Sequence, residues 1–80
     1  MNIVDRHADD VARIARRYGV KRLELFGSAA RGDFDPQASD LDFLVEFGPE
    51  PPGGAAHAYF DLLDALTDLF GRRIDLLSSR

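Results

Sequence analysis

The sequence predicts a single α/β domain over residues 1–80, with a three-stranded mixed sheet and helices packed on one face. Two long segments repeat apolar residues every three or four positions, as amphipathic helices do. Three short segments alternate apolar and polar residues, as half-buried strands do. The segments follow one another as helix, strand, short helix, strand, helix and strand, an order typical of α/β domains. Eighty residues are enough for one such domain, although its core must be thin.

The N-terminal segment is expected to form the first long helix, which Asn2 can cap. Its apolar stripe consists of Val4, Ala8, Val11, Ile14 or Ala15, and Tyr18. Acidic residues lie in its early turns and arginines in its late turns, an order that complements the helix dipole. Gly19 fits the left-handed residue that often follows a helix end.

The middle of the chain is expected to contain two strands, over residues 22–26 and 41–47. The first strand ends at Gly27, and residues 28–31 have the composition of a short helix whose free N–H groups lie near that glycine. A polar loop over residues 32–39 leads to the second strand. The apolar face of this second strand, which suits packing against helices, consists of Leu41, Phe43, Val45 and Phe47.

The last part of the chain is expected to form a loop, a second long helix and a third strand. Three prolines and three glycines predict a loop over residues 48–54. The helix over residues 55–70 can end at Gly71, and residues 72–77 alternate as a strand. The broad apolar stripe of this helix consists of Tyr59, Leu62, Leu63, Leu66, Leu69 and Phe70.

Composition excludes several classes of protein. The chain has no cysteine, which excludes disulfides and thiolate metal sites. No apolar run approaches the roughly 20 residues of a membrane span, and the polar N-terminus is unlike a signal peptide, so we expect a soluble cytoplasmic protein. The net charge of −4 argues against direct nucleic-acid binding, because phosphate backbones require a basic surface. The basic residues between positions 13 and 22 form either a solvated helix end or a patch for a phosphate or a partner.

Three aspartates carry the strongest chemical signal. Asp40 and Asp42 are two positions apart at the start of a strand, so their side chains point the same way, about 6–7 Å apart. That spacing suits one divalent ion or a pair of ions about 3.5–4 Å apart, and Mg²⁺ prefers such hard oxygen ligands. Asp75 on the third strand would lie on the same open face and converge with them, provided that the two strands are neighbours. It could then act as a general base towards a hydroxyl.

The turn at Gly27-Ser28 suits a phosphate. Gly27 lets the backbone approach a ligand closely, and Ser28 offers a hydroxyl in front of the free N–H groups of a helix start. An ordinary strand-to-helix turn remains the alternative, as does a surface position for Asp75. The sequence contains neither a Gly-x-Gly-x-x-Gly motif nor a P-loop lysine, which disfavours the Rossmann and P-loop readings.

The blocks Gly-Ser-Ala-Ala-Arg-Gly at residues 27–32 and Ser-Asp-Leu-Asp-Phe-Leu-Val at residues 39–45 resemble the signature of minimal nucleotidyltransferases of the polymerase-β superfamily. Residues 70–77 are similar to the strand that carries that family's third carboxylate. The resemblance implies transfer of AMP from ATP to a hydroxyl with the aid of Mg²⁺. It assigns the triphosphate to Gly27 and Ser28, with Arg31 touching a phosphate or bracing the loop. It assigns the metal ion and the catalytic chemistry to Asp40, Asp42 and Asp75.

Many small proteins that resemble this chain are antitoxins paired with a HEPN ribonuclease toxin, one of whose tyrosines they adenylylate. The resemblance therefore implies a protein adenylyltransferase whose partners are ATP and a HEPN-type toxin. The alternatives are a catalytically silent antitoxin that neutralises its partner by binding alone, and transfer to a small molecule. Two features depart from the family. The spacing between Ser28 and Asp40 is one residue longer than is common, and the chain ends where relatives continue into further helix.

Overall fold

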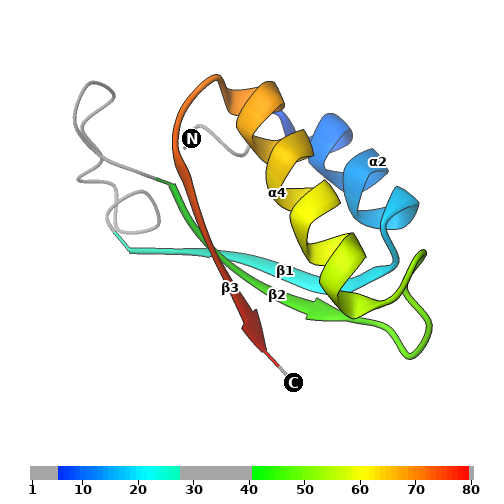
Figure 1. The fold of residues 1–80 in the computed structure, drawn as a ribbon. Coiled ribbons are helices and arrows are strands. Elements are labelled where there is room, and N and C mark those ends of the chain that lie inside the picture. Colours follow the sequence, from blue (N-terminus) through cyan, green and yellow to red (C-terminus); the bar gives the residue numbers. More distant parts are fainter. Residues whose placement is uncertain (1–5, 28–40, 80) are drawn as a thin grey trace.

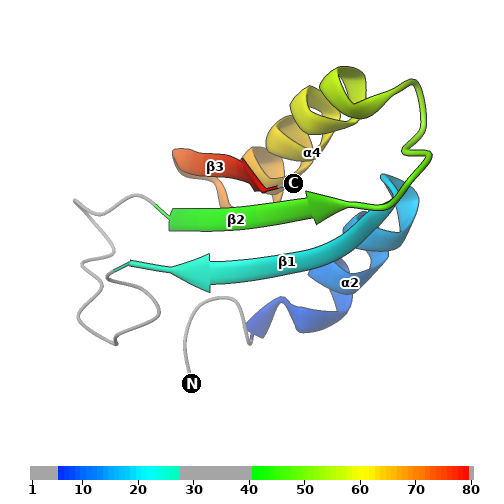
Figure 2. The ribbon, with the colours of Figure 1, turned by 90° about the horizontal axis from the view of Figure 1, so that it is seen from below.

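The computed structural model describes residues 6–27 and 41–79, in which two helices lie on one side of a three-stranded sheet (Figure 1). Seen from below, strands β1 and β2 lie in front of both helices (Figure 2). In chain order, the elements are α2 (Ala8–Arg17), β1 (Val20–Phe26), β2 (Leu41–Phe47), α4 (Ala55–Phe70) and β3 (Ile74–Ser79). The predicted short helix over residues 28–31 and the loop over residues 32–39 lie outside the described residues, as do Asn2 and Val4.

The sheet has the strand order β1-β2-β3 and is mixed, as predicted. Strands β1 and β2 are antiparallel, with Phe26 opposite Asp42. Strands β2 and β3 are parallel, with Asp42 opposite Asp75. Helix α4 connects this parallel pair, because parallel neighbours need a crossover connection. Strand β2 is therefore central, and its residues have neighbours on both sides.

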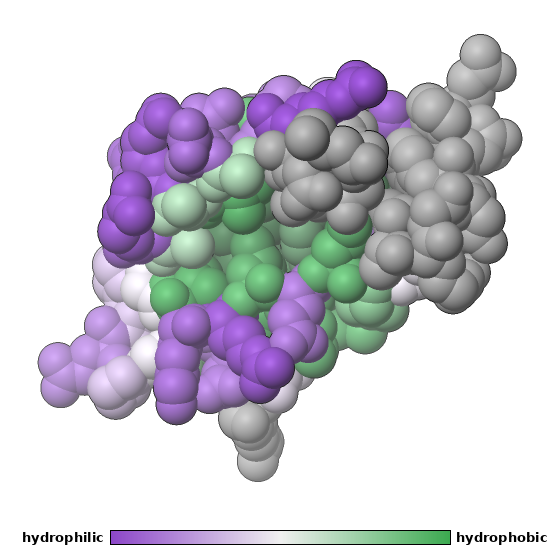
Figure 3. Space-filling model, turned by 180° about the vertical axis from the view of Figure 1, so that it is seen from behind, coloured by the Kyte–Doolittle hydropathy of each residue, from purple (hydrophilic) through white to green (hydrophobic). Residues whose placement is uncertain are grey.

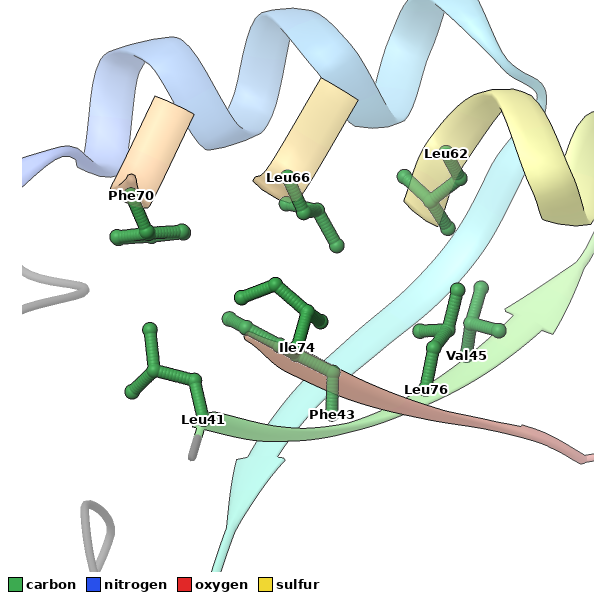
Figure 4. Packing of buried hydrophobic residues seen from close by; sticks show 8 residues of the cluster. All are labelled: Leu41, Phe43, Val45, Leu62, Leu66, Phe70, Ile74 and Leu76. Atoms are coloured by element: carbon green, nitrogen blue, oxygen red, sulfur yellow. The ribbon is translucent and has the colours of Figure 1, made fainter. Parts of the chain in front are cut away.

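The core lies between α4 and the helix-facing side of β2 and β3. Figure 4 shows three side chains of α4 pointing towards the side chains of these two strands. The eight side chains of this buried cluster are Leu41, Phe43, Val45, Leu62, Leu66, Phe70, Ile74 and Leu76. All five strand residues among them occupy alternate positions on the side facing α4, and both described helices lie on that side of the sheet (Figure 1).

Helix α2 packs less completely than α4. None of its residues is buried, and Val11 and Ile14 only partly cover the core. Ala8, which the predicted stripe included, is exposed because the helix contacts the core mainly through the later turns. Figure 3, seen from behind, shows a hydrophobic area at the centre of the surface, framed by hydrophilic residues. The half-buried apolar residues of α2 and β1 are consistent with this area.

Two strand boundaries differ from those predicted. Strand β1 begins at Val20 rather than at residue 22, because its ladder with β2 extends to the pair of Val20 and Phe47, across an irregularity in register. Strand β3 runs over Ile74–Ser79 rather than 72–77. Its ladder starts where Ile74 meets Leu41 and continues to the pair of Ser79 and Glu46.

Both predicted helix ends at glycine are confirmed. Gly71, with φ of 64°, is the left-handed C-cap of α4, and its N–H donates to the carbonyl of Thr67 at 2.8 Å. Gly19, with φ of 70°, follows α2. In the described parts of the chain, no helix is long and apolar enough to cross a bilayer.

Candidate active site

Asp42 and Asp75 lie opposite each other on neighbouring parallel strands. The residues on either side of each aspartate belong to the buried core, so the alternation of the strands directs both carboxylates to the open face. Neighbouring strands are about 4.8 Å apart, which places the two acidic side chains side by side. The condition that the sequence left open, that the strands of Asp42 and Asp75 be neighbours, is therefore met.

The backbone of Gly27 lies directly against the carboxylate of Asp42. A Cβ atom added to Gly27 would lie 2.3 Å from Oδ2 of Asp42, far inside van der Waals contact. Gly27 also has φ of 76°, a left-handed conformation that residues with a side chain rarely adopt. Glycine is therefore required here both for the left-handed backbone and for the space that the carboxylate of Asp42 occupies. The sequence had assigned Gly27 to a phosphate and gave no indication of this contact.

The carboxylate pair suits a divalent cation. Like charges placed directly opposite each other in a sheet repel, so a cation between Asp42 and Asp75 would relieve the repulsion. Their donor atoms are hard oxygens, the kind that Mg²⁺ prefers, and Mg²⁺ commonly uses only one or two protein carboxylates. Within residues 6–27 and 41–79, no group of three or more metal-ligating side chains gathers. Asp40, the other carboxylate predicted to bind the metal, lies outside these residues, as do Ser28 and Arg31.

Apolar residues share the open face with the carboxylates. Phe26 of β1 lies opposite Asp42, and Leu44 of β2 lies opposite Leu77 of β3. Because side chains alternate along a strand, these three residues lie on the same face as the carboxylates. The sequence analysis gave them no role. The sequence signal for a role is their apolar character on the face of the sheet that lies opposite α2 and α4.

Three basic residues near the N-terminal helix form exposed ion pairs. Arg13 lies 3.1 Å from Asp10, Lys21 lies 3.3 Å from Glu46, and Arg22 lies 2.6 Å from Glu24. Such exposed pairs contribute only about 0–1 kcal/mol each. This arrangement favours the solvated helix end over a dedicated phosphate patch.

Comparison with known proteins identifies the family. Residues 5–78 match the family model described as "Nucleotidyltransferase domain". The chain belongs to this family. A solved structure described as that of a "putative minimal nucleotidyltransferase" matches it with a TM-score of 0.77 and 35% identity, over 98% of this chain and 78% of that one. The predicted fold class is therefore confirmed.

Two relatives have informative names. A protein of Methanocaldococcus jannaschii named "Putative protein adenylyltransferase" is 39% identical over 64 residues, which are 80% of this chain and 61% of the relative. The protein adenylyltransferase MntA of Thermococcus cleftensis is 34% identical over 64 residues, again 80% of this chain and 61% of the relative. The chain thus spans about three fifths of the length of these relatives.

Proposed function

We propose that this nucleotidyltransferase domain moves AMP from ATP to a protein hydroxyl with the aid of Mg²⁺, and that the hydroxyl belongs to a tyrosine of a HEPN-type toxin. The observation that carries the proposal is the convergence of Gly27, Asp42 and Asp75 at one end of the open face. Family membership and the names of the two relatives support the same chemistry. By modifying its partner, the protein would act as an antitoxin.

Each residue of the site has a distinct role in this proposal. Asp42 and Asp75, together with Asp40, would hold Mg²⁺, which when bound neutralises phosphate charge. The backbone at Gly27 and the hydroxyl of Ser28 would hold the triphosphate, with Arg31 on a phosphate or bracing the loop.

The reaction is a displacement at the α-phosphorus of ATP. The oxygen of the acceptor hydroxyl forms a new bond to the α-phosphorus, and the bond from that phosphorus to the bridging oxygen breaks. Pyrophosphate leaves with the electron pair of the broken bond. Asp75, the more exposed carboxylate of the pair, accepts the hydroxyl proton as general base.

The test is transfer of label from ATP labelled on the α-phosphate, in the presence of Mg²⁺, to a co-purified or candidate toxin. We expect one labelled protein band, no band with ATP labelled on the γ-phosphate, and loss of the band in Asp42→Asn and in Asp75→Asn. Asp64→Asn, which removes an exposed carboxylate from α4, is the matched control and should retain transfer. Full transfer by Asp42→Asn would refute the assignment of the site.

A growth assay separates modification from simple binding. If the antitoxin acts by adenylylation, Asp42→Asn should fail to neutralise a co-expressed HEPN-type toxin, whereas Asp64→Asn should succeed. Neutralisation by both variants would instead favour an antitoxin that acts by contact alone.

A further inference from the structure

On the open face of the sheet, different kinds of residue lie in successive rows along the strands. Gly27 lies just beyond the end of β1, against Asp42. The next row across the sheet consists of Phe26, Asp42 and Asp75. Two residues further along the strands, about 6–7 Å away, Leu44 lies between Glu24 of β1 and Leu77 of β3. Along the open face, the side chains therefore pass from the turn at Gly27, through Asp42 and Asp75, to Leu44 and Leu77.

The apolar residues of this face are unusually exposed for their type. Leu77 is 48% exposed and Phe26 is 37% exposed. They are two of the three large hydrophobic residues that are exposed in the described chain, and the third, Phe60, belongs to α4. The two exposed apolar side chains of the sheet thus lie next to the candidate site, and Leu44 lies between their strands. We define Leu44 and Leu77 as the apolar platform.

In-line displacement determines on which side of the carboxylates the acceptor must lie. The attacking oxygen and the leaving pyrophosphate occupy opposite sides of the phosphorus during phosphoryl and nucleotidyl transfer. In the proposed function, the triphosphate lies at Gly27 and its α-phosphate lies beside Asp42 and Asp75. The acceptor hydroxyl therefore approaches from the opposite side of the carboxylates, where Leu44 and Leu77 lie.

We infer that the apolar platform binds the aromatic ring of a tyrosine acceptor and so selects tyrosine over serine and threonine. This inference rests on the proposed function. A phenol ring carries its hydroxyl at the far end of a flat apolar body, so a ring lying on Leu44 and Leu77 presents the oxygen to the carboxylate row. The platform begins one row, about 6–7 Å, from that row, a distance comparable to the length of a tyrosine side chain. The short apolar bodies of serine and threonine cannot cover the platform while their hydroxyls reach the carboxylates.

The substitution Leu77→Ser tests the inference, because it removes the more exposed leucine of the platform without opening the core. The probes are N-acetyl-tyrosinamide and N-acetyl-threoninamide as acceptors, with Mg²⁺ and ATP labelled on the α-phosphate. We expect wild type to prefer the tyrosine probe, and Leu77→Ser to lower kcat/KM for that probe by roughly tenfold through a higher KM. The KM for ATP should not change. Phe60→Ser is the matched control, because it removes an exposed apolar residue of α4 and should leave all these values unchanged.

The outcomes of this assay distinguish the inference about the platform from the proposed function. Unchanged kcat/KM for the tyrosine probe in Leu77→Ser would overturn the inference while leaving the proposed function in place. A raised KM for ATP would also overturn it, because the platform would then bind the adenine ring. If wild type modifies neither probe, binding is measured directly by methyl NMR with Mg²⁺ and α,β-methylene-ATP. Shifts of the Leu44 and Leu77 methyl signals on addition of the tyrosine probe would support the platform, and the missing transfer would then contradict only the proposed function. Unchanged methyl signals would overturn the platform.

Discussion

The substitution Gly27→Ala should disable the carboxylate pair by displacing Asp42. The new methyl group would lie 2.3 Å from Oδ2 of Asp42, whereas real Cβ atoms essentially never approach another heavy atom within 3.0 Å. The shortfall is too large for small adjustments of the sheet, because Asp42 belongs to the central strand and is held between buried neighbours. The carboxylate must therefore rotate away from Gly27 and change its position relative to Asp75.

The same substitution also strains the backbone, and this second effect can be measured separately. A residue with a side chain in the left-handed conformation costs about 1–2 kcal/mol relative to glycine. Gly71 provides the matched control, since its φ of 64° is similar to the 76° of Gly27 and an added Cβ would meet no atom within 4 Å. We expect Gly71→Ala to lose about 1–2 kcal/mol of unfolding free energy and to retain transfer. Gly27→Ala should lose at least as much stability and, in addition, most of the transfer.

The assay combines urea denaturation, Mn²⁺ binding followed by paramagnetic broadening, and transfer of α-labelled AMP under conditions where both variants are folded. Only Gly27→Ala should show weaker broadening at the Asp42 and Asp75 signals. If Gly27→Ala transferred AMP as well as Gly71→Ala, the close approach of Gly27 to Asp42 would have no functional meaning, and the reasoning would be refuted.

Three further predictions concern stability. Tyr59→Phe removes the hydroxyl that donates to the carbonyl of Leu76, which joins α4 to the edge strand β3, and should cost about 1 kcal/mol in urea denaturation; no change would show that the bond contributes nothing. Leu66→Ala empties a fully buried position under the sheet and should cost about 2–5 kcal/mol, whereas Leu77→Ala at a half-exposed position should cost about 0.5 kcal/mol or less. Equal losses for these two leucines would contradict the assignment of the two faces. Lys21→Ala breaks an exposed pair with Glu46 and should change the unfolding free energy by less than about 1 kcal/mol; a larger loss would mean that the pair is part of a coupled network.

The faces of the strands could be predicted from the sequence, but their ends could not. Alternation alone places Phe43 towards the helices and Asp42 away from them, because each choice buries one set and exposes the other. The start of β1 at Val20 and the shift of β3 to Ile74–Ser79 depend on where the partner strand offers hydrogen bonds. That information is not local, so a pattern within one segment cannot contain it.

The residues of the site could also be predicted from local sequence, whereas their contacts could not. The motif residues Gly27, Asp42 and Asp75 could be recognised by type and by spacing. Their contacts required the register of two ladders, which brings Phe26 opposite Asp42 on one side and Asp75 opposite it on the other. The positions of Ser28, Arg31 and Asp40, and the single-domain assignment over residues 1–80, stay predictions.

The buried residues of strand β2 fix the register of the sheet, and the register determines the geometry of the site. A slip of one residue would turn Asp42 into the core and the buried residues Leu41, Phe43 and Val45 out to solvent. Burial of a large apolar side chain stabilises by about 1.5–3 kcal/mol, so such a slip is strongly disfavoured even before the cost of a buried carboxylate is added. The same buried residues that stabilise the fold thus hold Asp42 against Gly27 and opposite Asp75. For this reason, core substitutions in β2 should impair the chemistry of the open face even though they touch none of its residues.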